Sequence, residues 1–230
     1  MRNASLLLTA CLLPAWSATP AARIGPVTTR LDVQGQPLEV TVSGMIMPVR
    51  DALHAILSAD LADLQRKLTP LVAAQLNQSN RCGERLTIQR VTLAPAAPSA
   101  MLTAAVHFEK WGCAKAFGKE IVKKLAAGDG AVVVKLTPEV AEGKSLRLAA
   151  EVVSIDASGP LADLLRSGSL GDAVREKIRA SLGAVLQKCT DFEATLPEVI
   201  EEHAVIGGAE FRDGGEGRLI LRVESEIRAR

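Results

Sequence analysis

Few side chains in this 230-residue sequence are of the types that perform chemistry. The three histidines are His54, His107 and His203, which the hydrophobic periodicity places on a helix, on a strand and at a strand entrance. His107 shares the polar side of its strand with Thr103 and Glu109, which favours a solvated histidine over a catalytic one. A catalytic site needs a nucleophile, a base and a group that orients the base. We therefore expect a protein that is not an enzyme.

Serine, phosphate and metal chemistry have equally little support. Residues 168–171 (GSLG) are better explained as a helix break followed by an N-cap at Ser169 than as a nucleophile elbow. The sequence has no histidine pair at helical spacing and no phosphate-binding Gly-x-x-x-x-Gly-Lys loop, so we expect no metal and no cofactor. A hydrolase that uses Ser167, Ser169 or a free cysteine is the least favoured of the functional hypotheses that the sequence allows.

Three cysteines, Cys82, Cys113 and Cys189, follow the first 21 residues. A disulfide between two of them is expected in an oxidising compartment. We favour Cys82 with Cys113, because both lie at the ends of elements that flank one predicted hairpin. Three buried thiols are the alternative, and a zinc site is less favoured because no close Cys-x-x-Cys pair exists.

The first residues predict export from the cytoplasm. Arg2 precedes an apolar run from Ala4 to Ala15 and then a stretch of small residues and prolines, which is the layout of a signal peptide. The run is shorter than the roughly 20 residues that a permanent membrane helix needs. Residues 8–11 (LTAC) offer lipidation at Cys11 as a less favoured alternative. We expect a signal peptide over residues 1–21, one domain over 22–230, and a location in the periplasm or cell envelope.

Charge and composition exclude one class of partner and suggest another. The 27 basic and 26 acidic residues nearly balance, whereas a nucleic-acid-binding domain is strongly basic. A small cluster formed by Lys115, Lys119, Lys123 and Lys124 could meet an anionic lipid surface, although a solvated helix face is the favoured interpretation. Trp111 and Phe117 flank Cys113 and either pack on the core or contact a ligand. The chain has no tyrosine and only 3% aromatic residues, so its interior is aliphatic and would suit an acyl chain.

The hydrophobic periodicity predicts two long helical regions. The first runs from Pro48 to about Asn77 and is bent or split at Pro70. Its apolar stripe consists of Leu53, Ile56, Leu57, Leu61, Leu64, Leu68, Val72 and Leu76. The second begins after Pro160, is interrupted at Gly168 and ends near Lys188. A short helix is expected over Lys119 to Ala126.

Alternating apolar and polar residues predict strands that pair as hairpins. The expected pairs are Val27 to Val33 with Leu38 to Val42, Arg85 to Leu93 with Met101 to Glu109, Ala131 to Leu136 with Leu146 to Ile155, and Ala204 to Phe211 with Arg218 to Ile227. Sheets with one apolar face and helices with one apolar stripe must bury them against each other. The chain is therefore predicted to be an α+β protein.

Three short segments carry a resemblance to a known superfamily. Residues 80–86 (NRCGERL), 111–113 (WGC) and 164–171 (LLRSGSLG), in this order among helices and hairpins, resemble the tubular lipid-binding (TULIP-like, BPI-like) proteins, specifically bacterial secreted relatives. The resemblance covers most of residues 25–228. It implies a strongly curved antiparallel sheet, built of hairpins, that wraps long amphipathic helices and holds a lipid in between. The chain departs from the superfamily in having one short unit instead of a tandem.

The expected function is therefore a non-enzymatic envelope protein that binds a lipid or another apolar molecule between the sheet and the helices. A structural or adaptor protein, which uses a sheet edge or residues 111–118 to contact another envelope protein, is the alternative. The residues expected to line the ligand space are Leu57, Leu61, Leu64, Leu68, Val106, Phe108, Val174, Ile178 and Leu182. For each of them ordinary core packing is the competing interpretation.

Overall fold

The computed structural model describes residues 21–33, 35–79, 82–116, 119–159 and 204–228, together with residues 162–163, 168, 172, 176 and 194–195. In chain order the elements of this part are β1 (Ala22–Val33), β2 (Gln36–Val49), β3 (Ala52–Asp60), α1 (Ala62–Leu76), β4 (Gln78–Ser79), β5 (Gly83–Ala96), β6 (Ser99–Ala116), β7 (Lys119–Ala141), β8 (Ser145–Ala157), β9 (Ala194–Thr195), β10 (Ala204–Asp213) and β11 (Leu219–Arg228).

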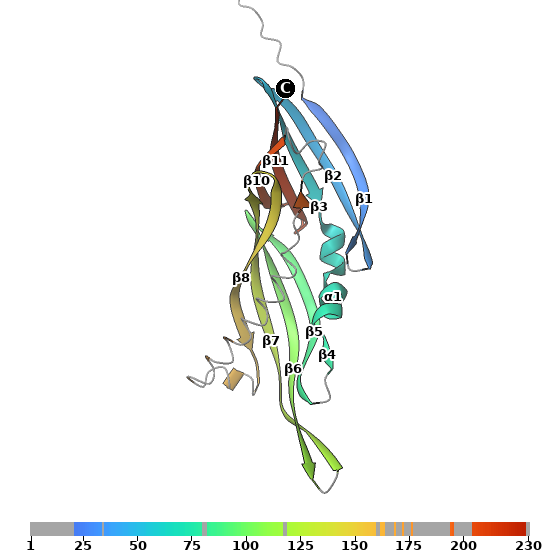
Figure 1. The fold of residues 1–230 in the computed structure, drawn as a ribbon, viewed down its shortest axis with the longest axis vertical. Coiled ribbons are helices and arrows are strands. Elements are labelled where there is room, and N and C mark those ends of the chain that lie inside the picture. Colours follow the sequence, from blue (N-terminus) through green and yellow to red (C-terminus); the bar gives the residue numbers. More distant parts are fainter. Residues whose placement is uncertain are drawn as a thin grey trace, which may run out of the picture.

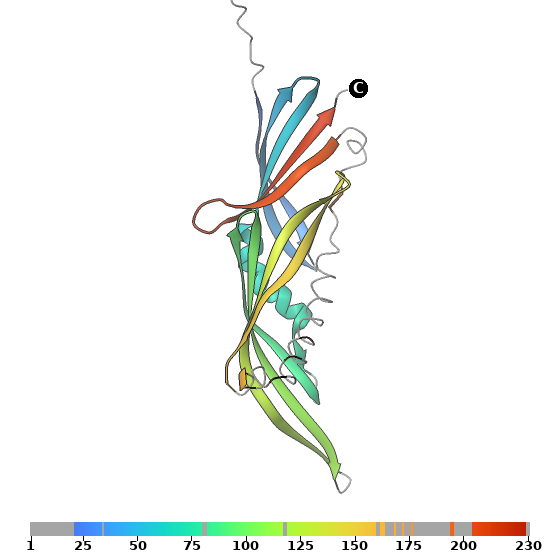
Figure 2. The same cartoon turned by 90° about the vertical axis from the view of Figure 1, so that its left-hand side faces the viewer.

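These strands form two antiparallel sheets. The first sheet has the order β1-β2-β3-β11-β10, and the second has the order β4-β5-β6-β7-β8-β9, in which β4 and β9 are two-residue strands. The two sheets follow one another along the long axis of an elongated molecule, with α1 beside their junction (Figure 1). Figure 2 shows the same succession from the side, with the C-terminal hairpin crossing the junction.

The core lies where α1 meets both sheets. Its buried residues come from α1, from the three strands β5, β6 and β7, and from the C-terminal hairpin: Leu68, Ile88, Val91, Leu93, Ala100, Val132, Val134, Leu136, Phe211 and Leu219. Backbone hydrogen bonds also join the sheets directly. Phe211 N–H donates to Pro98 O at 2.8 Å, and Ile206 N–H donates to Gly143 O at 2.6 Å.

The expected α+β architecture, a curved sheet wrapped around long helices, is wrong. The described part is mostly β, its two sheets are not curled around a helix, and its helix α1 has only 15 residues. In the second sheet the strands pair in chain order, whereas in the first sheet β3 pairs with β11, and in the described part neither sheet closes on itself.

The predicted helix over residues 48–77 is correct only in its second half. Residues 52–60 form β3, which lies between β2 and β11 in the first sheet. A central strand can be apolar on both faces, and Leu53 and Leu57 face one side of the sheet while Ile56 faces the other. Their spacings also fit a helical stripe, which explains the error. Pro70 lies inside α1 without splitting it, on an exposed position.

The short helix predicted over Lys119 to Ala126 is also wrong, because these residues belong to β7 and pair with β6. The four predicted hairpins are confirmed, as β1 with β2, β5 with β6, β7 with β8, and β10 with β11. At the first turn Gly35 takes a left-handed φ of 76°, and its N–H donates to Asp32 Oδ1 at 2.8 Å. The second predicted long helix, residues 161–188, falls almost entirely outside the described residues.

Candidate functional site

One face of the second sheet is aliphatic across its long strands. Side chains alternate along a strand, so paired residues of neighbouring strands share a face. One such row consists of Leu93, Leu102, Val134 and Val152, one residue from each of β5, β6, β7 and β8. We call the side of the sheet that carries this row its aliphatic face.

The helix α1 packs on the β5 side of this face. Leu68 is 9% exposed, and Leu61, Leu64, Val72 and Leu76 pack against the same core. On the far side of the face, Leu148, Val152 and Ile155 are only partly buried. The aliphatic face is therefore broader than the area that α1 buries.

The first sheet has an aliphatic face as well. The register places Val42, Ala59, Leu221 and Phe211 in one row across β2, β3, β11 and β10. Phe211 and Leu219 pack in the core that the second sheet also contributes to, so the two aliphatic faces meet there.

The aliphatic face of the first sheet continues beyond the core. Val27 pairs with Val42, Leu31 pairs with Leu38, and Leu53 pairs with Ile227, so all three lie on this face. Their exposed fractions are 60%, 46% and 42% respectively. Exposed aliphatic side chains that continue a buried apolar surface can contact an apolar ligand without rearrangement of the core.

Six of the nine predicted lining residues lie in the described part, and all six contribute to these aliphatic surfaces. Leu61, Leu64 and Leu68 belong to α1 or its start, and with Val106 they pack in the core. Leu57 lies on β3 and not on a helix, on the aliphatic face of the first sheet. Phe108 is half-buried on β6, between Leu86 and Gly128. The remaining residues, Val174, Ile178 and Leu182, lie outside the described residues.

The opposite face of the second sheet carries a cluster of charged and aromatic side chains, which we call the Glu109 cluster. Its members are Arg85, His107, Glu109, Trp111, Lys124 and Asp129. Lys124 pairs with Glu109, and the Trp111 indole N–H donates to Glu109 Oε2 at 2.8 Å. Arg85 stacks on Trp111, with the guanidinium carbon 4.4 Å from the ring centroid.

The ion pairs of the Glu109 cluster stabilise the charged forms of Glu109, His107 and Asp129. The Lys124 ammonium, followed by the Trp111 N–H, lowers the pKa of Glu109 to about 2. His107 Nδ1 lies 2.7 Å from Asp129 Oδ1, and this hydrogen bond raises the pKa of His107 and lowers the pKa of Asp129.

This arrangement is not that of a catalytic base. The other ring nitrogen of His107, Nε2, faces Glu109 at 3.6 Å, so both nitrogens contact carboxylates. A general base needs one nitrogen directed at a nucleophile or a substrate. His107 therefore acts as an ion-pair partner. The sequence placed it correctly on the polar side of its strand but did not reveal the cross-strand pairing with Asp129.

Cys82 and Cys113 form a disulfide, the pairing that the sequence analysis favoured, with the two Cα atoms 5.7 Å apart. The bond joins the segment before β5 to β6 next to Trp111. The disulfide therefore links the start of β5 to the part of β6 that carries Trp111 of the Glu109 cluster.

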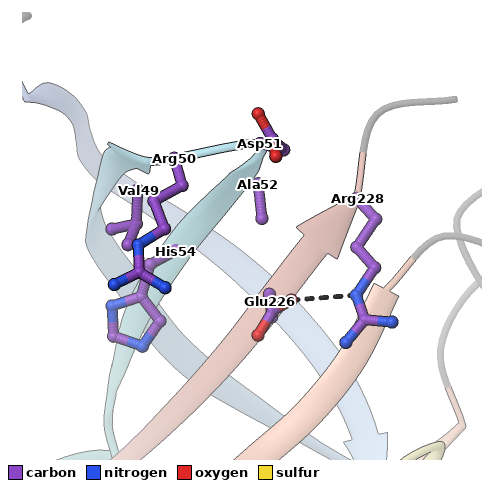
Figure 3. Close-up of a pocket in the computed structure, with 7 residues that line it drawn as sticks. All are labelled: Val49, Arg50, Asp51, Ala52, His54, Glu226 and Arg228. Atoms are coloured by element: carbon purple, nitrogen blue, oxygen red, sulfur yellow. Dashed lines mark hydrogen bonds and ion pairs between the residues drawn. The ribbon is translucent and has the colours of Figure 1, made fainter.

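A separate cavity of about 620 Å³ opens at the turn between β2 and β3. Figure 3 shows the side chains of Arg50, Asp51 and His54 there, with Glu226 and Arg228 on β11. Arg228 pairs with Glu226 at 2.9 Å, so the charged groups of β11 satisfy each other. This hollow is open to solvent, and none of the predicted lining residues lies at it.

The described residues contain no group of three or more His, Cys, Asp or Glu side chains that could hold a metal ion. Within the same ranges no helix has the length and apolar content for a membrane crossing. His203, Ser167, Ser169 and Cys189 lie outside the described residues.

The chain shows no significant similarity to any family of known proteins, curated protein or solved structure. The resemblance to the tubular lipid-binding superfamily therefore remains a prediction from the sequence.

Proposed function

We propose that this protein is a non-catalytic protein of the bacterial cell envelope that binds an apolar ligand, such as a lipid, on its aliphatic faces. The observation that carries the proposal is the continuation of a buried aliphatic face into the exposed residues Val27, Leu31 and Leu53. A monomeric soluble protein has little reason to present such a surface unless it has an occupant.

The chemistry of these faces suits an acyl chain. Their side chains are mostly Leu, Val, Ile and Ala, which offer contact area but few hydrogen-bond partners. A flexible hydrocarbon chain gains from such a surface through burial alone, at about 25 cal/mol per Å² of apolar area. A polar metabolite would leave its hydrogen-bonding groups unpaired there.

The Cys82–Cys113 disulfide supports the envelope location, because disulfides persist in oxidising compartments. The expected signal peptide lies outside the described residues. Fusion of residues 1–21 to an alkaline phosphatase that is active only after export would test the location.

The ligand proposal is tested by native mass spectrometry of the purified protein and by thermal unfolding with added phosphatidylglycerol or palmitate. Retained lipid, or a rise in Tm that grows with lipid concentration, is the expected result. A protein that retains no lipid and gains no stability from either probe would contradict the proposal.

A pair of double variants localises the binding. V27S/L31S removes exposed aliphatic side chains from the aliphatic face, and M45S/V49S removes exposed apolar side chains from the opposite face of the same sheet. The V27S/L31S variant is expected to bind lipid about fivefold more weakly, because each of its two substitutions removes most of an aliphatic side chain that contacts the ligand. M45S/V49S should bind as the native protein does.

An adaptor function is the second candidate, and one observation favours it. The 12-residue strand β1 is an outer strand that pairs with β2 alone in the described part of the chain. The free edge of such a strand can add a strand from another protein. Co-purification of one stoichiometric protein partner without lipid, abolished by Thr28→Pro, would favour this function over lipid binding.

A further inference from the structure

The β6–β7 hairpin extends well beyond the rest of its sheet. Pairing of β5 with β6 stops at Gly83 and Trp111, and pairing of β7 with β8 stops at Gly130 and Ala157. Among the described residues, 112–116 and 119–126 therefore pair only within the β6–β7 hairpin, and neither segment pairs with β5 or β8. We call them the β6–β7 ribbon. In both views the ribbon projects from the end of the molecule farthest from the C-terminus (Figures 1 and 2).

The base of the ribbon is fixed. A two-stranded ribbon has marginal stability in water by itself. Here the Cys82–Cys113 disulfide ties the ribbon to the start of β5. Two residues before Cys113, the ring of Trp111 lies beside both Arg85 and Lys124. Leu125 also packs closely over Gly112, where an added Cβ would come within 2.9 Å of Leu125 Cδ1. These contacts therefore anchor the base of the ribbon to the sheet.

The ribbon presents aliphatic side chains to the solvent. Gly112, Ala114 and Ile121 continue the aliphatic face of the sheet, and the bulged Leu125 covers the same side. Ile121 is 53% exposed and Leu125 is 62% exposed, the highest value among the large exposed hydrophobic residues of the described part. These side chains lie beyond the area that α1 covers.

The charge of the same segment is strongly positive. Residues 110–125 contain five lysines, at positions 110, 115, 119, 123 and 124, against one acidic residue, Glu120. Lys115 and Lys123 are exposed on opposite faces of the ribbon. Lys124 is engaged by Glu109 at the base.

We infer that the β6–β7 ribbon docks the protein on an anionic lipid bilayer. Exposed aliphatic side chains flanked by lysines are the combination that enters the boundary between headgroups and acyl chains. Ile121 and Leu125 enter this boundary from one face of the ribbon, where Lys123 beside them meets the anionic headgroups, and Lys115 adds positive charge on the other face. A neutral chain as a whole would not be attracted to such a surface, so the local clustering of lysines is what makes the ribbon the point of contact. This inference goes beyond ligand binding on the aliphatic faces and does not depend on it.

The experiment is cosedimentation of the full chain with vesicles of phosphatidylcholine alone and of phosphatidylcholine with phosphatidylglycerol. We expect binding to the anionic vesicles that weakens as salt is added, because salt screens the lysines. The variant K115Q/K123Q should bind the anionic vesicles about tenfold more weakly, and I121S/L125S should also bind more weakly. The controls K135Q and V153S, which change exposed residues of β7 and β8 within the sheet, should bind as the native protein does.

Insertion is measured separately through brominated lipids that quench tryptophan fluorescence. Ile121→Trp should be quenched more than the native protein, whereas Val153→Trp, at a position that is also 53% exposed, should not. Equal binding to neutral and anionic vesicles, unchanged binding of both ribbon variants, or equal quenching at the two positions would overturn the inference. So would a lack of any vesicle binding by the native protein. The ribbon variants should still retain lipid in native mass spectrometry, so this inference and the proposed function can fail independently.

Discussion

The side-chain oxygen Oε1 of Gln65 in α1 accepts a hydrogen bond from the backbone N–H of Leu219 in β11, at 2.9 Å. The amide nitrogen of the same side chain donates to Leu93 O in β5 at 2.7 Å and to Gly217 O at 2.9 Å. One polar side chain therefore joins the helix to a strand of each sheet. The junction of the two sheets is organised around it.

Replacement of Gln65 by Leu should destabilise the protein by about 2–4 kcal/mol. Leu219 is fully buried, so the variant leaves its backbone N–H without a partner, and the Leu93 carbonyl loses its donor. Leucine and glutamine have similar helix propensities, so the loss of stability reports the missing hydrogen bonds at the junction and not a weaker helix. Urea unfolding measures the effect. Gln75→Leu, at an exposed position of α1, is the matched control and should change stability by less than about 0.5 kcal/mol. Equal stability of the two variants would contradict this role of Gln65.

Asp63 should make the protein sensitive to acid. Its carboxylate accepts the Glu39 backbone N–H at 2.9 Å and pairs with Lys67 and Arg66, which lowers its pKa to about 2. Because the folded pKa lies below the unfolded value of 3.8, the stabilisation is present above about pH 4 and is lost as the pH falls through 2.

The Asp63 prediction is measured by thermal unfolding between about pH 2 and pH 7. Asp63→Asn should be less stable than the native protein at neutral pH and should approach it at the acid end. Asp51→Asn changes an exposed aspartate in the turn between β2 and β3 and should leave the pH profile unaltered. A constant difference between Asp63→Asn and the native protein at every pH would refute the prediction.

The disulfide should contribute about 3–4 kcal/mol to stability, because it closes a segment with a sequence separation of 31 residues. The variant C82S/C113S should unfold at correspondingly lower urea concentration. Addition of a reductant should lower the stability of the native protein but should not change that of the variant. A reductant effect of equal size in both proteins would place the responsible bond elsewhere.

His107 should titrate above the ordinary range because of its hydrogen bond to Asp129. Since its pKa is raised from 6.5, the stabilisation by this pair is complete below that pH and is lost as the pH rises through the folded pKa of His107. An NMR titration of the imidazole should show the raised pKa, and Asp129→Asn should bring the pKa down toward 6.5. Asp156→Asn, which removes an exposed carboxylate from β8, serves as the comparison and should leave the titration of His107 in place. A His107 pKa that does not respond to Asp129→Asn would disprove the pairing.

The sequence by itself determined the features that depend on neighbouring residues. Alternation, as of Leu219, Leu221, Val223 and Ile227 with polar residues, predicted the hairpins, because in a strand with one buried face the apolar side chains recur at every second residue. The same local pattern placed Cys82 and Cys113 at matching ends of one hairpin, and it placed Leu61, Leu64 and Leu68 on one side of a helix.

The tertiary structure decided the features that depend on partners far along the chain. Leu53 and Leu57 have spacings that fit a helix as well as a strand, and pairing with β2 and β11 selects the strand. Lys119 to Ala126 becomes a strand because β6 pairs with it. Likewise, the hydrogen bond between Gln65 and Leu219 joins residues 154 positions apart, and the ion pair between His107 and Asp129 joins residues 22 positions apart. Periodicity records only which side of an element is apolar, whereas the choice of partner depends on long-range pairing that no local pattern contains.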